Sequence, residues 1–193
     1  MRHLFIYPLV FLIGCQSTTK IDCSKVDWRN KGQLVATAGL QKNQALEDLV
    51  IQCKKKDPLV DHKAFKAGYK DGLMLFCKAE VGLSMGKAGK LYNNTCPKSE
   101  ELSFLKGYIN GRIIYLKDQL NQSKGDYANA KDRFWRKEQE YLLIKSEDPE
   151  EAKMQRDFLE AYQEESNQLR KSTDALKKEL NYLKRKREEL NFN

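Results

Sequence analysis

Apolar residues recur at heptad spacing along the second half of the chain and predict a long helix. The a and d positions of one unbroken frame run from Ile113 to Ile144, and only Ser123 and Lys137 interrupt them with polar side chains. A frame of this length is typical of a helix that packs along a second helix. Gly125 weakens the helix locally, because glycine costs about 1 kcal/mol relative to alanine in a helix interior.

A helix-start signal follows and opens a second heptad frame. An aspartate that can cap a helix precedes Pro149, and glutamates come directly after it. Leucine then stands at every seventh place from Leu169 to Leu190. The pattern predicts an antiparallel helical hairpin, a coiled coil, over residues 113–193 with its turn near 146–149. The alternative is a single long helix in a parallel oligomer, kinked at the proline.

The first half of the chain carries a short repeat of aromatic residues and glycines. The motif F-x-x-G-Y-x-x-G occurs twice, offset by 39 positions. Its members are Phe65, Gly68, Tyr69 and Gly72 in the first copy and Phe104, Gly107, Tyr108 and Gly111 in the second. Glycines four residues apart weaken a helix, and the simplest compensation is a side-chain-free stripe against which another backbone or a ring can lie. We therefore expect a helix-contact motif here and not a pair of turns.

Two further groups of small residues keep a similar spacing. A looser copy begins at Trp28 and continues with Gly32, Ala36 and Gly39, and another group consists of Gly82, Gly86 and Gly89. The second group stands close to Asn93, Asn94 and Pro97, which are typical of turns. For this group the helix-contact and turn interpretations both remain open.

Composition and charge divide the chain into two parts. Of its 193 residues 32% are charged, and the mean hydropathy is −0.72, which favours long exposed helices over a thick core and argues against a large enzyme with a deep pocket. Residues 1–98 hold 16 basic and 8 acidic side chains, whereas residues 99–193 hold 19 of each. We place a small helical head at 23–112 and a charge-balanced extension at 113–193.

The first 14 residues are typical of an export signal. A positive start at Arg2 is followed by an apolar run of 11 residues from Leu4 to Gly14. A helix that spans a bilayer needs about 20 apolar residues, so the run predicts a signal peptide over residues 1–14 and not an integral helix.

The end of this run carries a second feature. The residues Leu12-Ile13-Gly14-Cys15 resemble the lipobox of bacterial lipoproteins. The resemblance implies that Cys15 becomes the lipidated first residue, carrying fatty acids such as palmitate, and that residues 15–22 form a lipidated tether. Gln16 stands where an aspartate would retain the protein at the inner membrane, which implies outer-membrane sorting. An ordinary secretory signal with an incidental cysteine is the alternative.

Export changes the interpretation of the other cysteines, which are Cys23, Cys53, Cys77 and Cys96. An even number in an oxidising compartment predicts two disulfides. Three pairings are possible, and we favour Cys23 with Cys53 and Cys77 with Cys96, because each pair brackets one apolar segment. A four-cysteine zinc site would need short paired spacings that this sequence lacks. Thiol exchange, which requires free reactive cysteines, is a weaker hypothesis.

Few residues offer catalytic chemistry. His62 is the only histidine left after processing, so a Ser-His-Asp hydrolase would depend on it. Asp71 and Glu80 could form an acid/base pair acting on peptidoglycan, but nothing in the sequence marks their environment. We expect no catalytic residues, no cofactor and no metal site.

Two short basic runs raise the question of polyanionic partners. They are Lys54-Lys55-Lys56 and the segment from Lys184 to Arg187. Export excludes nucleic acid, which leaves anionic lipid, lipopolysaccharide or wall polymer. A solvated surface is the simpler interpretation of both runs.

Taken together, the pattern is similar to the bacterial lipoprotein family catalogued as domain of unknown function 2799. The elements of the resemblance are the lipobox, Cys23, Asp27-Trp28 with the spaced glycines, Cys53, the stretch from Phe65 to Cys77, the glycines of 82–89, Tyr92, Cys96-Pro97 and the second aromatic motif. The resemblance covers about residues 15–120 and implies a fold and a location, but no activity. The family commonly carries Gly-x-x-Asp-Gly where this chain has Gly32-Gln33-Leu34, so the first copy is expected to pack differently.

The sequence therefore predicts an all-α protein with a small disulfide-stapled, glycine-rich helical head and a long antiparallel helical hairpin. We expect a non-enzymatic lipoprotein anchored on the periplasmic side of the outer membrane. Its coiled coil is expected to engage another envelope component or a second copy of the chain. The alternative is a protein that binds cell-wall glycan, or an enzyme or enzyme accessory acting on peptidoglycan, through the aromatic and glycine groove of the head.

Overall fold

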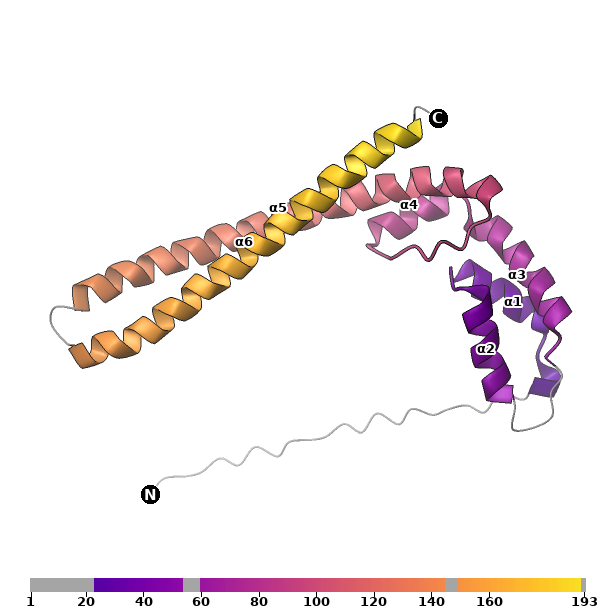
Figure 1. Cartoon of the computed structure of the whole chain (residues 1–193), viewed down its shortest axis with the longest axis horizontal. Coiled ribbons are helices and arrows are strands. Elements are labelled where there is room, and N and C mark those ends of the chain that lie inside the picture. The colour runs from indigo at the N-terminus through magenta and orange to yellow at the C-terminus, as the bar shows by residue number, and fades with distance from the viewer. Residues whose placement is uncertain (1–22, 54–59, 145–148, 192–193) are drawn as a thin grey trace, which may run out of the picture.

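The computed structural model describes residues 23–53, 60–144 and 149–191, and the regular elements in these ranges are all helices. They are the 3-10 turn η1 (Cys23–Lys25) and the α-helices α1 (Trp28–Thr37), α2 (Lys42–Cys53), α3 (His62–Phe76), α4 (Ala79–Lys87), α5 (Lys98–Ile144) and α6 (Pro149–Asn191). The predicted all-α class is confirmed. Figure 1 shows a head built from α1 to α4 and the beginning of α5, from which α5 and α6 project as a hairpin.

The helices of the head begin at capping residues. Asp27 accepts a hydrogen bond from the backbone N–H of Asn30 at 3.0 Å, and Asp61 accepts one from Ala64 at 2.8 Å. These side chains satisfy backbone donors that have no partner within the first turn of α1 or α3.

Helices α1 and α3 pack side by side with their backbones in direct contact. A methyl group on Gly68 would overlap the carbonyl oxygen of Arg29, and one on Gly72 would overlap that of Gln33. Because the contacting positions rise together along both helices, α1 and α3 run parallel. Contacts of a glycine Cα with a facing carbonyl oxygen are favourable at such close helix crossings.

Helix α4 and the beginning of α5 form a second pair of the same kind. A methyl group on Gly107 would overlap the carbonyl oxygen of Ala79, and one on Gly111 would overlap that of Leu83. The positions on α3 and α5 differ by 39, and those on α1 and α4 differ by 50. The head is therefore a tandem repeat of one unit, a parallel helix pair in direct backbone contact.

The two units also end in the same way. Gly39 and Gly89 both follow the first helix of their pair with φ of 70°, a left-handed conformation that glycine adopts without strain. An aromatic ring of the second helix, Phe76 or Tyr115, lies where a side chain on that glycine would stand. The first helix of each unit therefore ends in the same glycine turn, covered by an aromatic ring.

The tyrosines of the aromatic motif tie each unit together at this end. The hydroxyl of Tyr69 donates to the carbonyl oxygen of Leu40 at 2.9 Å, and that of Tyr108 donates to Lys90 at 3.0 Å. Each bond links the second helix of a unit to the residue just beyond the terminal glycine of the first.

The structure corrects the assignment of the looser copy that begins at Trp28. Gly32 faces the backbone of Phe65, as Gly82 faces the backbone of Phe104. The looser group therefore corresponds to the glycines of 82–89, which pack against the aromatic motif, and it is not a third copy of that motif. Spacing alone does not distinguish two stripes that lie against each other.

The glycines of 82–89 divide between the two interpretations. Gly82 and Gly86 are buried helix contacts within α4, whereas Gly89 is a turn residue.

Each unit carries one disulfide at the same place in its topology. Cys23 is bonded to Cys53, with 5.8 Å between their Cα atoms, and Cys77 is bonded to Cys96, with 5.6 Å between theirs. In both units the bond joins the segment before the first helix to the segment before the second. These are the two pairs that the sequence favoured.

The units differ in what fills the space beside the helix pair. In the first unit α2 packs there, contributing Leu49 to a core that includes Trp28 and Phe65. In the second unit a non-helical segment takes this place, and the ring of Tyr92 lies 4.6 Å from that of Phe104 between centroids. Tyr92 also accepts a hydrogen bond from the backbone N–H of Cys96 at 3.0 Å.

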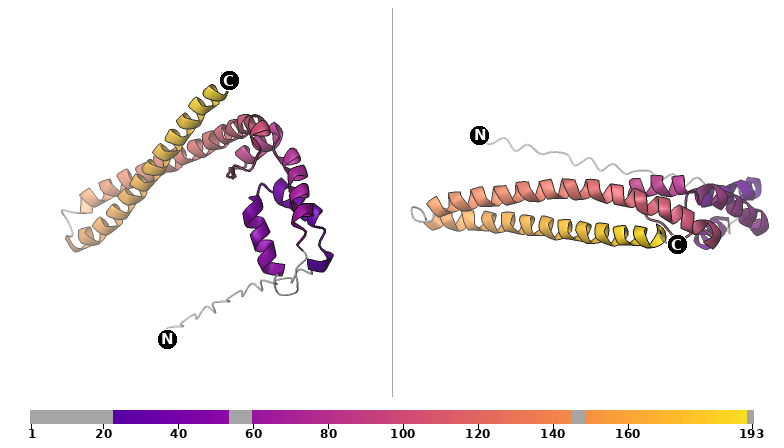
Figure 2. Two further views of the ribbon diagram at one scale, coloured as in Figure 1. Left: turned by 45° about the vertical axis from the view of Figure 1, so that its right-hand side comes forward. Right: turned by 90° about the horizontal axis from the view of Figure 1, so that it is seen from above.

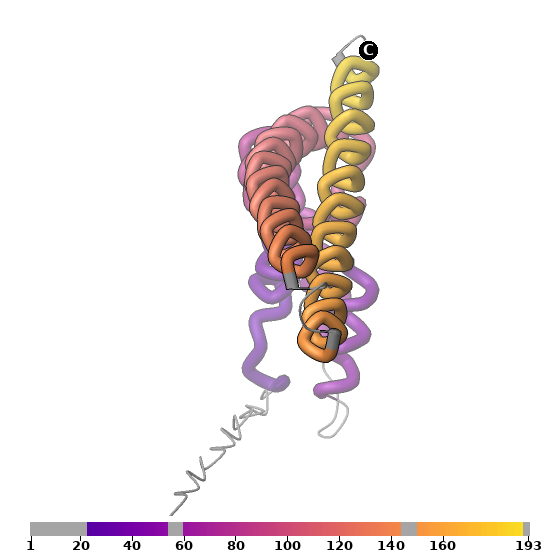
Figure 3. Tube along the Cα trace, turned by 90° about the vertical axis from the view of Figure 1, so that its left-hand side faces the viewer, coloured from indigo at the N-terminus to yellow at the C-terminus, as the bar shows by residue number. Residues whose placement is uncertain are grey.

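Helices α5 and α6 form the predicted antiparallel hairpin, which Figure 2 shows extending from the head and Figure 3 shows from its distal end. Helix α5 is unbroken from Lys98 to Ile144, so it belongs both to the head and to the hairpin. Near the head, Leu116 and Leu120 on α5 pack in one cluster with Leu180 on α6.

Polar contacts mark the register of the two arms. Arg112 pairs with Glu179, Ser123 with Thr173, and Arg133 with Glu165, so positions rise on α5 as they fall on α6. The hydroxyls of Ser123 and Thr173 lie 2.7 Å apart, and Thr173 also donates to the carbonyl oxygen of Leu169 at 2.7 Å. The interruption of the first frame at Ser123 therefore meets Thr173 of α6 inside the seam, where the two hydroxyls are hydrogen-bonded. Lys137, the other interruption, pairs with Glu140 of its own helix.

Within the described ranges, no helix combines the length and apolarity that crossing a bilayer requires.

Candidate functional site

The aromatic and glycine motif forms the interior of the head and not an open groove. Phe65 and Phe104 are fully buried, and Tyr69 is 7% exposed. The backbone of the facing helix fills the space beside the glycines of the motif. The predicted helix-contact residues are therefore brought together as packing, and Tyr108, the one half-buried ring of the motif, donates its hydroxyl to the carbonyl oxygen of Lys90.

The four disulfide cysteines are also buried, with exposures between 3% and 8%. A disulfide that exchanges with an external thiol must be reached by the attacking thiolate. Burial of the sulfur-bearing residues in both units is typical of structural bonds. Cys15, the predicted lipidation site, lies outside the described residues.

The three candidate catalytic residues are not assembled into a site. Asp71 forms an ion pair with Arg29 at 2.7 Å. His62 begins α3, nine positions earlier, which is about 13 Å along the helix axis. Glu80 lies on α4 in the other unit. In the described part of the chain, no group of three metal-ligating side chains is close enough to hold an ion.

A hollow lies where the two units meet. It has a volume of about 410 Å³ and is lined by Thr37, Ala38, Phe76, Glu80, Val81, Ser84, Met85 and Lys90. The hollow is open to solvent and mostly apolar, and its carboxylate faces no histidine among the lining residues. It offers no arrangement of groups that would perform acid/base or nucleophilic chemistry.

Only one of the two predicted basic runs lies within the described residues. Lys54-Lys55-Lys56 lies outside the described residues. On α6, Lys186 forms an ion pair with Glu189 at 2.9 Å, so part of that run is neutralised within its own helix.

Buried tyrosines make the head sensitive to alkaline pH. Burial raises the pKa of Tyr69 and of Tyr92 above the ordinary 10.0, because the phenolate is costly to desolvate. A group whose pKa is raised on folding contributes stability that is complete below the unfolded pKa and is lost as the pH rises through the folded pKa.

We therefore expect the melting temperature of the head to fall above pH 10, over the pH range in which the phenolate absorbance of these tyrosines rises. Tyr69→Phe should lower stability at neutral pH by about 1 kcal/mol through loss of its hydrogen bond, and should weaken the alkaline decline. Tyr182→Phe is the matched control, since Tyr182 is 55% exposed. An alkaline decline that is the same in both variants would contradict this assignment.

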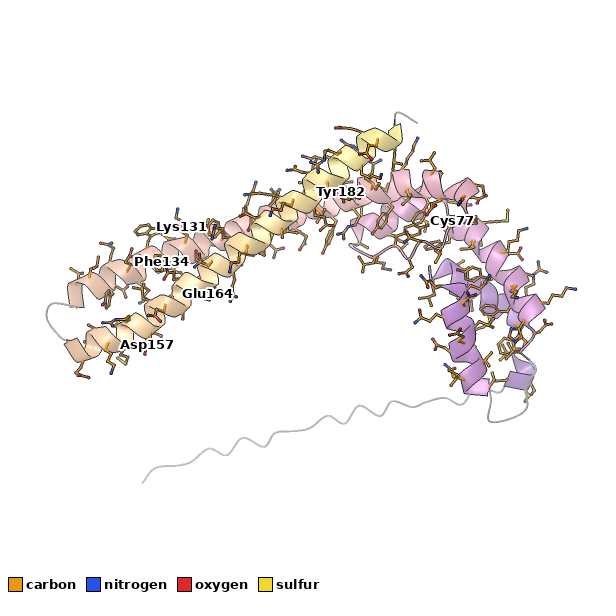
Figure 4. The ribbon with its side chains drawn as sticks, in the orientation of Figure 1. Cys77, Lys131, Phe134, Asp157, Glu164 and Tyr182 are labelled. Carbon is orange, nitrogen blue, oxygen red and sulfur yellow. A yellow bond between two sulfur atoms is a disulfide. The ribbon has the colours of Figure 1, made fainter. Side chains whose placement is uncertain are left out.

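The surface feature that heptad analysis missed is a cluster of exposed apolar side chains in the distal part of the hairpin. We call it the tip surface; its members are Trp135, Leu142, Leu143, Met154 and Phe158, which are between 51% and 73% exposed. Figure 4 labels Phe134 and Asp157, the chain neighbours of Trp135 and Phe158, in this distal part of the hairpin. Large apolar residues outside the a and d positions were the available signal, but a heptad analysis weighs only those two positions.

The fold is thus all-helical, with a head made of two parallel helix pairs, each with one disulfide, and a projecting hairpin. Residues 27–113, which comprise the head, match the family described as Protein of unknown function (DUF2799). This match supports the resemblance to domain of unknown function 2799 over that part of the chain. The chain matches no curated protein and no solved structure.

Proposed function

We propose that the protein is a lipid-anchored lipoprotein on the periplasmic side of the bacterial outer membrane, and that it acts without catalysis by holding another envelope protein. The lipobox ending at Cys15 supports the anchor. The head supplies a disulfide-bonded base, and the hairpin, from Ile113 to Ile144 on α5, reaches about 45 to 50 Å from it.

The observation that carries the binding role is the tip surface. Exposed apolar side chains occur near the head too, with Ile114 42% and Tyr182 55% exposed, but the tip surface gathers five of them and includes Leu143 at 73%. A helix pair in water gains nothing from large apolar side chains outside its seam, and exposed apolar patches mark interaction sites. A partner with an apolar surface would bury them at the distal end of the hairpin.

The glycan-acting alternative has no comparable support. It would need the rings of the aromatic motif, or His62, Asp71 and Glu80, to face a common ligand. Phe65, Tyr69 and Phe104 are buried and Tyr108 is half-buried, and the three polar residues are distributed over the two units.

The test is cross-linking of intact envelopes with a tip variant, Leu143→Gln with Met154→Gln and Phe158→Gln. Each large apolar side chain contributes about 1.5 to 3 kcal/mol when it is buried, so we expect the yield of the cross-linked partner to fall by at least about tenfold. The matched control replaces three exposed apolar residues of the head, Leu34→Gln with Ile51→Gln and Leu91→Gln, which are 56%, 63% and 76% exposed.

Circular dichroism should give both variants the melting temperature of the native protein. Unchanged partner recovery with the tip variant would refute the binding role, as would a cross-linked product that contains only a second copy of the chain. Incorporation of radiolabelled palmitate, abolished by Cys15→Ser, tests the anchor separately in the same strains.

A further inference from the structure

The outer face of α3 carries a line of lysines that no other element covers. Lys63, Lys66 and Lys70 are exposed and stand three and four positions apart, so they lie on one face of the helix. The opposite face holds the residues that pack against α1, including Phe65 and Tyr69. The ammonium groups of the three lysines therefore point away from the core of the head.

The positive charge on this face is not balanced by its neighbours. The two carboxylates of the helix and its cap are engaged elsewhere: Asp61 caps α3, and Asp71 pairs with Arg29. None of the ion pairs between described residues involves these three lysines. The lysine face thus presents three uncompensated cations to whatever lies beside it.

The same face continues into an exposed apolar residue. Met74 follows Lys70 by four positions and is 66% exposed. Cations next to a projecting apolar side chain suit a lipid surface, because the cations meet headgroup phosphates while the apolar side chain reaches the acyl boundary.

The lysine face also lies within reach of the predicted anchor. The described chain begins at Cys23, before α1, and because α1 and α3 run parallel this is the end of the pair at which α3 begins. Only eight positions separate Cys15 from Cys23, and an extended chain of that length spans at most about 28 Å. Figure 1 places α3 on the side of the head away from the distal end of the hairpin.

We propose that the lysine face of α3 docks on a surface of anionic phospholipid, and so sets the orientation of the head and hairpin relative to the membrane. This inference rests on the proposed lipid anchor, which would hold the face close to the bilayer. Each lysine at an anionic surface favours the docked state by about fivefold, and the three act together.

The test is chemical footprinting of the full-chain lipoprotein reconstituted into vesicles of phosphatidylethanolamine, with or without one third phosphatidylglycerol. On the anionic vesicles we expect acetylation of Lys63, Lys66 and Lys70 to slow by at least about fivefold. Lys117, Lys124 and Lys131 on α5, which are also exposed, are the internal reference and should not change. Molar salt should abolish the protection, because the Debye length then falls to about 3 Å.

A variant provides the second readout, which is oxidation of methionine by peroxide. Met74 should be protected relative to Met154, which is 55% exposed at the tip of the hairpin. The variant Lys63→Glu with Lys66→Glu and Lys70→Glu should lose this protection. The matched variant Lys117→Glu with Lys124→Glu and Lys131→Glu should keep it.

Equal acetylation of both lysine sets on anionic vesicles would overturn the docking proposal, and so would protection that is the same on both kinds of vesicle or survives molar salt. Flotation of the vesicles reports the anchor independently. A chain that floats without protecting α3 refutes docking and leaves the anchor standing. A chain that does not float refutes the anchor, while footprinting with excess anionic vesicles still decides docking.

Discussion

Replacing Gly68 or Gly107 by alanine is expected to destabilise the head by about 3 to 5 kcal/mol, enough to unfold much of it at physiological temperature. The added methyl group would overlap the carbonyl oxygen of Arg29 or of Ala79. A backbone oxygen cannot move aside as a flexible side chain can, so the two helices of the unit must separate. Separation exposes the fully buried rings of the aromatic motif and removes the contacts that close packing provides.

The chain contains a matched control for this substitution. Gly125 lies within α5, and nothing stands within 4 Å of the position that its methyl group would take. Gly125→Ala is therefore expected to stabilise the protein by about 1 kcal/mol through its higher helix propensity. Thermal and urea unfolding followed by circular dichroism measures both effects. Wild-type stability of Gly68→Ala and Gly107→Ala would show that the helices do not meet through their backbones.

This pair of outcomes reflects what glycine spacing can and cannot predict. The spacing of Gly68 and Gly72 predicted a side-chain-free stripe, and the stripe is a helix contact. The spacing did not predict which helix packs against the stripe. A glycine stripe allows the close approach of a second helix, but it does not identify that helix. The looser group that begins at Trp28 was therefore taken for a further copy of the motif, although it lies on the helix that the motif packs against.

The hairpin was easier to predict because a heptad frame specifies a neighbour as well as a face. Pro149 begins α6 as its position predicted, and the seam leucines pack as the frame requires. The polar interruptions appeared as isolated defects in each frame, and only pairing the arms showed that Ser123 meets Thr173. The tip surface was missed for the opposite reason, since Trp135 and Phe158 stand outside the frame.

The sequence reveals only part of the tandem repeat in the head. The two units share the glycine contacts, the terminal turns and the position of the disulfide, all of which are demanded by backbone geometry. They differ where side chains merely fill space, with α2 in the first unit and Tyr92 in the second. A search for repeated letters finds the first group and is blind to the second. Because each unit has one disulfide, the contribution of each bond to the stability of the head can be measured separately.

Removal of either disulfide is expected to destabilise the head, and the first bond should matter more. For the variant Cys23→Ser with Cys53→Ser the chain-entropy relation gives about 3.6 kcal/mol, and for Cys77→Ser with Cys96→Ser it gives about 3.2 kcal/mol, from separations of 30 and 19 residues. Loop length alone therefore accounts for a difference of only about 0.4 kcal/mol. The first bond also fixes the end of α2, which contributes Leu49 and Cys53 to the core of its unit. Without it, α2 has to be held by side-chain packing alone.

Urea unfolding of both double variants under oxidising conditions separates the two contributions. If α2 depends on the bond, Cys23→Ser with Cys53→Ser will lose clearly more than 0.4 kcal/mol beyond the other variant, and its loss of helical signal on mild denaturation will precede the main transition. Equal losses would mean that Leu49 and its neighbours hold α2 without the bond. A larger loss for Cys77→Ser with Cys96→Ser would place the weaker point of the head in the second unit, where the segment around Tyr92 has no helix of its own to order it. In either case the hairpin should keep its helicity, because the seam around Leu116, Leu120 and Leu180 contains no residue of either bonded segment.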